Sequence, residues 1–266
     1  MITSAFPPAL GELWRKHFYD AIRVSLSLDE KADISSRDLL RSFFADNGTV
    51  TKKLLDDATL KIKGNDCVIF GAGPSLEEDL KGLQNYILRK RPVIVAADGA
   101  ADALALHEII PDIIVSDLDS CSFKNLKACS QNGVVFAHAH GDNMNLVRAI
   151  VPKLGENKIG TTQVETKKPV YDFGGFTDGD RACFVTSFFS PRKLVIAGMD
   201  FGTGEGEFSL NRYGQPKNPK RPLKLEWGKK SLEFLIENSP SIRFLNVTAQ
   251  GVEIRGLSKV PYSVVI

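Results

Sequence analysis

The sequence predicts an α/β protein with a doubly wound, mainly parallel sheet, flanking helices and a further helical segment at its N-terminus. From residue 66 onward, short apolar runs alternate with stretches of helical periodicity, the pattern of strands joined by crossover helices. Successive apolar runs end in Gly or Asp, as expected where buried parallel strands leave a sheet. The chain has 266 residues, 43% of them hydrophobic, which is enough for one large core.

The first 64 residues predict helices rather than strands. Apolar residues at helical spacing indicate a helix over residues 10–24. Ser35 and Asp38 have the spacing of a capping box, so a second helix is expected to begin there, and Asn47 and Gly48 are expected to close it or to turn the chain. We therefore divide the chain into an N-terminal helical segment, residues 1–64, and an α/β domain, residues 65–266.

In the larger domain, the expected strands are the apolar runs that precede the Gly- and Asp-bearing turns. They cover residues 67–70, 93–96, 113–115, 134–137, 169–173 and 194–197. The helices expected after them cover residues 76–89, 101–109, a stretch ending at 188, and 225–236. Two closing strands are expected at residues 244–247 and 252–254. Strands that alternate with helices in this way predict parallel pairing.

Composition argues against several classes of protein. A net charge of +2 is too small to indicate a nucleic-acid partner. The four cysteines have no CxxC spacing, which favours a reducing compartment over a disulfide framework or a zinc site. The chain shows no signal-peptide pattern, and no apolar run approaches the ~18–20 residues of a membrane span. We expect a cytoplasmic protein without a membrane or nucleic-acid partner.

Carboxylates follow the predicted strands at the point where each strand ends. Asp117 and Asp119, separated by one residue, come directly after the run at 113–115. The other such residues are Asp98, Asp142, Asp178 and Asp200. Because the carboxyl ends of parallel strands share one edge, these acids predict a site for a metal-bound nucleotide there, with Mg²⁺ as the suitable hard cation. Taken alone, Asp117 and Asp119 fit a strand-ending turn equally well.

Two glycine-rich turns offer candidate ligand contacts. The turn Gly71-Ala72-Gly73-Pro74-Ser75 joins a strand to a helix, where free backbone N–H groups can bind an anion. A tight turn with Ser75 as N-cap explains the same residues as well. Gly174 and Gly175 precede Asp178 and Arg181, so close approach of the backbone to a ligand and a phosphate clamp by Arg181 are expected.

Two further features carry weaker signals. His138 and His140 alternate like metal ligands, but no third ligand has suitable spacing, so contact with phosphate or a metal-bound water is the functional interpretation and a structural histidine the alternative. Residues 201–222 are rich in Gly and Pro and basic at Arg212, Lys217, Lys220 and Arg221. This composition suits a flap over phosphates and also a plain solvated connection.

In order and spacing, these motifs resemble a known family. Asp98-Gly99-Ala100 and Ser116-Asp117-Leu118-Asp119-Ser120 look like the signature of thiamine pyrophosphokinases. The run His138-Ala139-His140-Gly141-Asp142-Asn143 departs from that family's second acidic cluster. Together with residues 71–76, 198–202 and 246–248, the chain is more similar to the archaeal 6-hydroxymethyl-7,8-dihydropterin pyrophosphokinases over nearly its whole length.

The resemblance implies transfer of a diphosphate from ATP to a reduced pterin with release of AMP, in folate- or methanopterin-type cofactor synthesis. It makes residues 65–266 the catalytic domain. Asp117 and Asp119 are then expected as Mg²⁺ ligands, supported by Asp142 and Asp98, with Asp117, Asp119 and Asp142 as the catalytic set. The expected nucleotide contacts are Gly71, Gly73, Pro74, Ser75, Asp98, Gly99, His138, His140, Gly174, Gly175, Asp178, Arg181 and Asp200. The sequence identifies no general base.

Three other functions fit parts of this pattern. A thiamine pyrophosphokinase would share the metal site and differ in its acceptor pocket. Some nucleotide-sugar-dependent glycosyltransferases carry a related Gly-Pro-Ser-Leu segment, as at residues 73–76, but need fewer acidic strand ends. A nucleotide-binding regulator without turnover is the third. The apolar N-terminal helices also offer a surface for a homo-oligomer.

Overall fold

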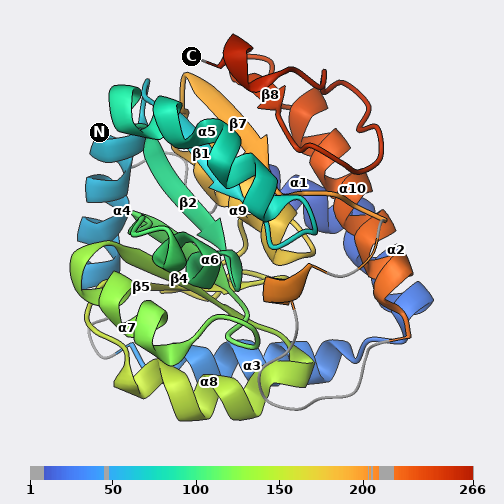
Figure 1. Cartoon of the computed structure of the whole chain (residues 1–266). Helices are drawn as coiled ribbons and strands as arrows, with labels where there is room; N and C mark the ends of the chain where they lie inside the picture. Colours follow the sequence, from blue (N-terminus) through green and yellow to red (C-terminus); the bar gives the residue numbers. More distant parts are fainter. Residues whose placement is uncertain (1–8, 45–47, 203, 205, 210–218, 266) are drawn as a thin grey trace.

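A computed structural model describes residues 9–44, 48–202, 204, 206–209 and 219–265, shown in Figure 1. Among these residues, one sheet contains eight strands, all paired in parallel. They are β1 (Asp66–Phe70), β2 (Val93–Ala97), β3 (Ile113–Ser116), β4 (Val134–Ala139), β5 (Lys158–Thr162), β6 (Val170–Tyr171), β7 (Lys193–Ala197) and β8 (Arg243–Asn246). The predicted α/β class with a parallel sheet is confirmed.

The sheet has the strand order β6-β5-β4-β3-β2-β1-β7-β8, so the direction of winding reverses between β1 and β7. One face is covered by the helices that follow the first four strands, α5 (Leu76–Lys90), α6 (Ala100–Leu106), α7 (Phe123–Asn132) and α8 (Met144–Ile150). The other face is covered by α9 (Asp178–Phe188) and α10 (Arg221–Glu237). Open α/β sheets bind ligands at such a reversal, outside the carboxyl ends of the strands.

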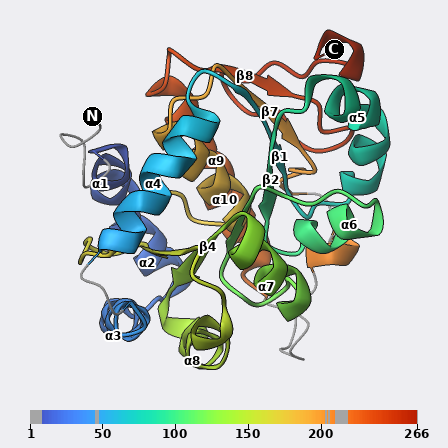
Figure 2. The same ribbon diagram turned by 90° about the vertical axis from the view of Figure 1, so that its left-hand side faces the viewer.

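The N-terminal segment is helical, as predicted. Its elements are α1 (Ala9–Trp14), the π-helical turn η1 (Arg15–Tyr19), α2 (Asp20–Leu26), α3 (Glu30–Arg41) and α4 (Thr49–Ile62). Figure 2 shows α1 and α4 on one side of the sheet and α5, α6 and α7 on the other. Trp14 is fully buried, and its indole N–H donates to Ser231 of α10 at 2.9 Å, which ties the segment to the α9–α10 face.

Three local predictions are wrong or incomplete. Helix α3 begins after Asp29, whose carboxylate accepts from the N–H of Lys31 at 2.9 Å; Ser35, predicted to cap the helix, lies inside it and donates to the Lys31 carbonyl. Residues 252–254 form no strand, only a bridge from Ile254 to Leu257. The elements β5, α7 and α8 were not predicted. Asn47 lies outside the described residues, and Gly48 precedes α4 in a left-handed conformation, which fits the alternative that the chain turns there.

Short 3₁₀ turns complete the described chain, and two of them border the site below. They are η2 (Gly141–Asn143), η3 (Val151–Lys153), η4 (Glu207–Ser209) and η5 (Tyr262–Val264). Within the described part of the chain, each helix is too short or too polar to cross a lipid bilayer.

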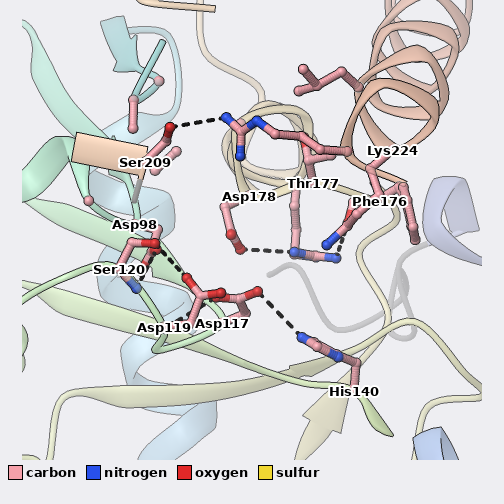
Figure 3. A pocket seen from close by; sticks show the side chains of 18 of the residues that line it. Asp98, Asp117, Asp119, Ser120, His140, Phe176, Thr177, Asp178, Ser209 and Lys224 are labelled. Atoms are coloured by element: carbon pink, nitrogen blue, oxygen red, sulfur yellow. Dashed lines mark hydrogen bonds and ion pairs between the residues drawn. The ribbon is translucent and has the colours of Figure 1, made fainter. Parts of the chain in front are cut away.

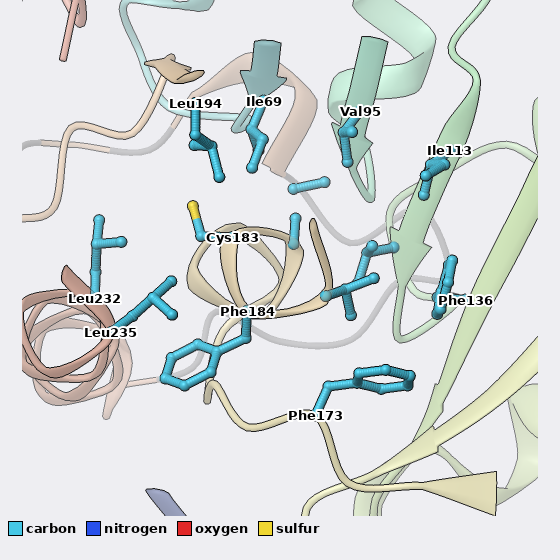
Figure 4. Close-up of a cluster of buried hydrophobic side chains, with 14 of the residues drawn as sticks. Ile69, Val95, Ile113, Phe136, Phe173, Cys183, Phe184, Leu194, Leu232 and Leu235 are labelled. Atoms are coloured by element: carbon cyan, nitrogen blue, oxygen red, sulfur yellow. The ribbon is translucent and has the colours of Figure 1, made fainter. Parts of the chain in front are cut away.

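Helix α9 lies in the middle of the larger core. Most of its residues are buried, and it packs against the sheet on one side and against α10 on the other. Figure 4 shows Cys183 and Phe184 of this helix among the side chains of Ile69, Leu194 and Leu235. A helix buried on both sides is rigidly positioned, because each of its faces is fixed by close packing. Its first turn, which begins at Asp178, is therefore held firmly at the edge of the sheet.

Candidate functional site

A cavity of about 600 Å³ lies along the carboxyl edge of the sheet, within the range of small-molecule sites. It spans the ends of β1, β2, β3, β4 and β7 and the starts of α3, α9 and α10. Most of the predicted site residues line it, namely Gly71, Gly73, Pro74, Asp98, Gly99, Asp117, Asp119, His140, Asp142, Asp178, Arg181 and Asp200. Ser75, His138, Gly174 and Gly175 are absent from this lining.

Three carboxylates meet at one point of this cavity (Figure 3). Asp98 follows β2, Asp117 follows β3 and Asp178 begins α9, and one oxygen from each lies within 4.8 Å of the others. Carboxylate oxygens at this spacing suit a hard divalent cation such as Mg²⁺. Of the four residues predicted as metal ligands, Asp98 and Asp117 belong to this cluster; Asp119 and Asp142 line the cavity outside it, and Asp178 joins it instead.

The loop after β3 is built around Asp98. The carboxylate of Asp98 accepts hydrogen bonds from the backbone N–H groups of Ser120 at 3.0 Å and Cys121 at 3.2 Å. Leu118 adopts a left-handed conformation with φ of 75°, which an extended strand would not show. Asp117 and Asp119 thus reach the same cavity through a kinked loop, rather than through the regular alternation assumed from the sequence.

The cluster is electrostatically unbalanced without a cation. Burial and the neighbouring charge of Asp117 raise the pKa of Asp98 and of Asp178 well above the usual range of a carboxyl. Burial acts in the same direction on Asp117, but the contact with His140 and the charge of Lys224 outweigh it and lower the pKa of Asp117. Asp117 is therefore the carboxylate of this cluster most firmly kept ionised, and its two neighbours resist ionisation.

The guanidinium of Arg181 has its main contacts inside the protein. It donates to the Asp178 carboxylate at 3.0 Å and to the carbonyl of Phe176 at 2.7 Å, and the residue is 3% exposed. Its geometry suits a residue that orients Asp178 better than the predicted phosphate clamp. Lys224, in the first turn of α10, lines the cavity and forms no side-chain hydrogen bond or ion pair with any described residue. Lys224 ends the basic stretch that begins at Arg212, in which the sequence suggested a flap over phosphates.

The Gly71–Ser75 turn does not provide the free N–H groups expected for an anion. The N–H groups of Gly71, Gly73 and Ser75 donate to Ala197 O, Gly198 O and the Asp200 carboxylate. A Cβ on Gly73 would lie 2.1 Å from an Asp200 oxygen, so the glycine is needed for packing against the β7 loop. A nucleotide that contacts this turn would therefore meet its van der Waals surface and not free backbone N–H groups.

The second glycine pair also serves packing. Gly174 and Gly175 have φ of 90° and 87°, and a Cβ on them would lie 2.7 Å from Phe184 and 2.5 Å from the Arg181 backbone. Both glycines therefore let this loop pass close to α9, which positions Asp178. The expected close approach to a ligand does not explain them.

The two histidines differ. His138 is fully buried, with Nδ1 3.0 Å from Thr161 Oγ1, and burial lowers its pKa well below the usual value. His140 lines the cavity with Nε2 3.4 Å from Asp117 Oδ2. His140 is oriented in turn by Asn143, which accepts from its backbone N–H at 3.0 Å. His138 therefore fits the alternative of a structural histidine, and His140 fits the interpretation as a residue of the site. Asp142, next to this pair, lines the cavity as an exposed residue.

Fold and site together define a doubly wound α/β protein with a carboxylate cluster in a ligand-sized cavity at the carboxyl edge of its sheet. The family model described as "6-hydroxymethylpterin diphosphokinase MptE-like" matches residues 41–206, and the chain belongs to this family. The matched range includes the ends of β1, β2, β3, β4 and β7, and thus all three carboxylates of the cluster.

Curated archaeal proteins are similar to the chain over most of their length. Three of them are named 6-hydroxymethyl-7,8-dihydropterin pyrophosphokinase. The protein from Methanothermobacter thermautotrophicus is 36% identical over 85% of this chain and 95% of its own. Those from Methanocaldococcus jannaschii and Pyrococcus furiosus are 37% and 35% identical, over 86% and 85% of this chain and 96% and 94% of their own.

A solved structure shares the fold. The MAf glycosyltransferase from Magnetospirillum magneticum AMB-1 aligns with a TM-score of 0.51 over 83% of this chain at 16% identity. The chain spans 40% of that protein's length. A likeness at this identity supports the fold alone and carries no argument about activity.

Proposed function

We propose that this protein transfers the terminal diphosphate of Mg²⁺-bound ATP to the hydroxyl of 6-hydroxymethyl-7,8-dihydropterin and releases AMP. This reaction would serve the cytoplasmic synthesis of folate- or methanopterin-type cofactors. The observation that carries the proposal is the 35–37% identity, over nearly their whole length, to three proteins named for this activity. The carboxylate cluster and Lys224 in one cavity support it, because a polyphosphate substrate needs a cation and positive charge.

In the proposed reaction, the hydroxymethyl oxygen attacks the β-phosphorus of ATP. A new P–O bond forms, the bond from that phosphorus to the bridging oxygen of the α-phosphate breaks, and AMP leaves with that oxygen. The hydroxyl proton is lost to solvent or to a nearby carboxylate. Such transfers depend mainly on positioning and on neutralising the charge of the phosphate oxygens.

Each residue of the cluster has a proposed task. Asp98, Asp117 and Asp178 would hold Mg²⁺, which when bound supplies positive charge beside the phosphates. Arg181 orients Asp178 and His140 orients Asp117. Such supporting contacts keep ligands in the geometry that binding needs.

Residues around the cluster have proposed tasks as well. Lys224 and Arg221 would bind the polyphosphate from the side of α10. Asp119 and Asp142 remain proposed for catalysis, and the surfaces of Gly71, Gly73, Pro74, Gly99 and Asp200 for nucleotide contact. Of the proposed basic flap, Arg212 and Lys217 lie outside the described residues.

The direct test follows AMP formation from Mg·ATP by chromatography, with the pterin and with thiamine as parallel acceptors. Wild type is compared with Asp117→Asn, which keeps the shape and removes the charge. Asp56→Asn on the exposed side of α4 is the matched control. We expect AMP with the pterin only, a loss of more than about 10²-fold in Asp117→Asn, and unchanged activity in the control.

Other outcomes would redirect the assignment. AMP with thiamine alone would keep the mechanism and reject the pterin as acceptor. Folded wild-type protein that forms no AMP with either acceptor would reject diphosphate transfer. A glycosyltransferase-like enzyme or a binding protein would then become the leading interpretation. Full activity of Asp117→Asn would reject the role of the cluster.

A further inference from the structure

The lining of the cavity differs chemically between the part from α9 and α10 and the part from α3, η2 and α8. Its lining contains Arg181, Arg221 and Lys224, which come from α9 and α10, and no other Lys or Arg among the described residues. A second end is formed by α3, η2, α8 and the residue after β5, and apart from His140 its polar side chains are carboxylates and amides. A triphosphate would be repelled there, whereas an uncharged ring with N–H groups would meet hydrogen-bond acceptors.

Gln163 is the polar group at this second end whose orientation is best fixed. It is 4% exposed, lines the cavity and donates from Nε2 to Asp33 Oδ2 at 2.8 Å. Because a carboxylate only accepts, this contact requires the amide nitrogen to face Asp33, so the amide oxygen faces away from it. The ring of the buried His138 is the other polar neighbour of this amide, and the amide oxygen still has a lone pair for a ligand because a carbonyl oxygen has two.

Asp33 holds this arrangement in place. Its carboxylate also accepts from the backbone N–H of Gly141 at 2.7 Å and from the hydroxyl of Tyr19 at 2.6 Å. A Cβ on Gly141 would lie 2.7 Å from the Cβ of Ala32, so α3 and η2 close this end of the cavity tightly. The Gln163 amide is therefore held by a buried helix carboxylate that accepts two further hydrogen bonds.

The walls of this end suit a flat ring. Leu28 and Ala32 line it from the side of α3 and Leu146 from α8, so apolar surfaces flank the polar group of Gln163. His140 lines the cavity as well and is 3.4 Å from Asp117, which connects this end to the cluster. Sites for heteroaromatic ligands commonly combine apolar walls with a few fixed polar groups.

We propose that this end, termed the α3 subsite (Leu28, Ala32, Asp33, Leu146 and Gln163), binds the ring of the reduced pterin, and that Gln163 Oε1 accepts a hydrogen bond from its N–H edge. The nucleotide then occupies the end toward α10, and the hydroxymethyl group points past His140 to the cluster. This assignment rests on the proposed function and makes Gln163 a specificity-determining residue for the acceptor.

The test measures KM for the pterin and for ATP separately, together with direct pterin binding by fluorescence titration without ATP. Gln163→Met keeps the side-chain length and removes the amide. Ala32→Phe fills the α3 subsite from a half-buried helix position, which keeps the test open if Gln163→Met folds poorly. Gln84→Met, exposed on α5, is the matched control. Circular dichroism verifies that each variant is folded.

We expect both site variants to raise KM and Kd for the pterin by about 10-fold or more, since a buried group that reads a polar ligand discriminates strongly. KM for ATP should change by less than about twofold, and the control should match wild type. A rise in KM for ATP instead would mean that the two ligands occupy reversed ends and would overturn the inference. Unchanged pterin constants in both variants would overturn it while the proposed function stands. Wild type that neither binds nor converts the pterin would reject the proposed function itself.

Discussion

Asp79 and Asp117 are two carboxylates close to the same edge of the sheet, and their surroundings differ in kind. Asp79 is fully buried and accepts hydrogen bonds from four donors. The donors are the N–H groups of Gly198 and Ala249 and the hydroxyls of Ser75 and Tyr262. Asp117 instead accepts one backbone hydrogen bond, from Asp119 at 3.3 Å, has a 3.4 Å contact with His140, and faces two further carboxylates.

The difference separates a structural carboxylate from one suited to a ligand. A buried acid with four donors is satisfied by the protein and connects the chain segments that supply them. Here those segments are the start of α5, the loop after β7 and the C-terminal region. An acid that faces other acids leaves repulsion for an external cation to remove. The number of donors therefore distinguishes Asp79 from Asp117, whereas Asp98 accepts backbone hydrogen bonds and still belongs to the cluster.

The largest effect on stability is expected at Asp79. Asp79→Ala leaves buried donors without an acceptor and should lower the free energy of unfolding by about 3 kcal/mol. For a chain of this size that corresponds to a fall in Tm of roughly 6–12 °C. Asp117→Ala should stay within about 1 kcal/mol of wild type, because it removes repulsion together with its few contacts. Thermal and urea unfolding of both variants measure the comparison, and equal destabilisation would erase it.

A second, smaller effect is expected from ligand binding. Mg²⁺ with ATP at roughly 30 times its Kd should raise the unfolding free energy of wild type by about 2 kcal/mol. Asp117→Asn should lose most of this increase, because the remaining carboxylates hold the cation less well. Differential scanning fluorimetry with Mg·ATP, and with ATP in EDTA, measures the shift. Equal shifts for both proteins would mean that the nucleotide binds without the cluster.

The sequence predicts the fold well and the site in part, for a definite physical reason. Parallel strands place their carboxyl ends at one edge, so acids after successive strands had to lie close together. Which of them touch depends on strand order, and the sequence does not reveal that β7 pairs with β1. Asp200 accordingly supports Ser75 across the β1–β7 boundary, while Asp178 reaches the cluster from a helix.

The remaining failures come from contacts between distant residues. The glycines at 73 and 174 were predicted as ligand contacts, which stays a prediction, and the sequence did not reveal that each also lets another part of the protein pack closely. Strand β5 has the sequence Lys-Ile-Gly-Thr-Thr, whose polar residues and glycine hide a buried strand. Gln163 follows that strand and meets Asp33, which lies 130 residues earlier. No local sequence pattern predicts this contact, because the two residues come together only when α3 packs beside β5.

Asp172 provides the test with the smallest expected effect, because its surroundings are intermediate between those of Asp79 and those of Asp117. It is 3% exposed, accepts from Arg15 at 3.2 Å and from Gly174 at 2.9 Å, and burial raises its pKa to about 7. Its ordinary pKa is about 3.9, so the folded state holds the proton more tightly than the unfolded state. The stability that this group contributes is complete below about pH 4 and is lost as the pH rises through about 7.

Asp172→Asn removes this titration while keeping the shape of the side chain. The unfolding free energy of wild type minus that of Asp172→Asn should therefore fall by on the order of 1 kcal/mol between pH 5 and pH 8. Urea unfolding at four pH values in this range measures the difference. A difference that grows with pH would show instead that Arg15 keeps Asp172 ionised in the folded protein. A falling difference would place Asp172 with the carboxylates that the fold only partly compensates.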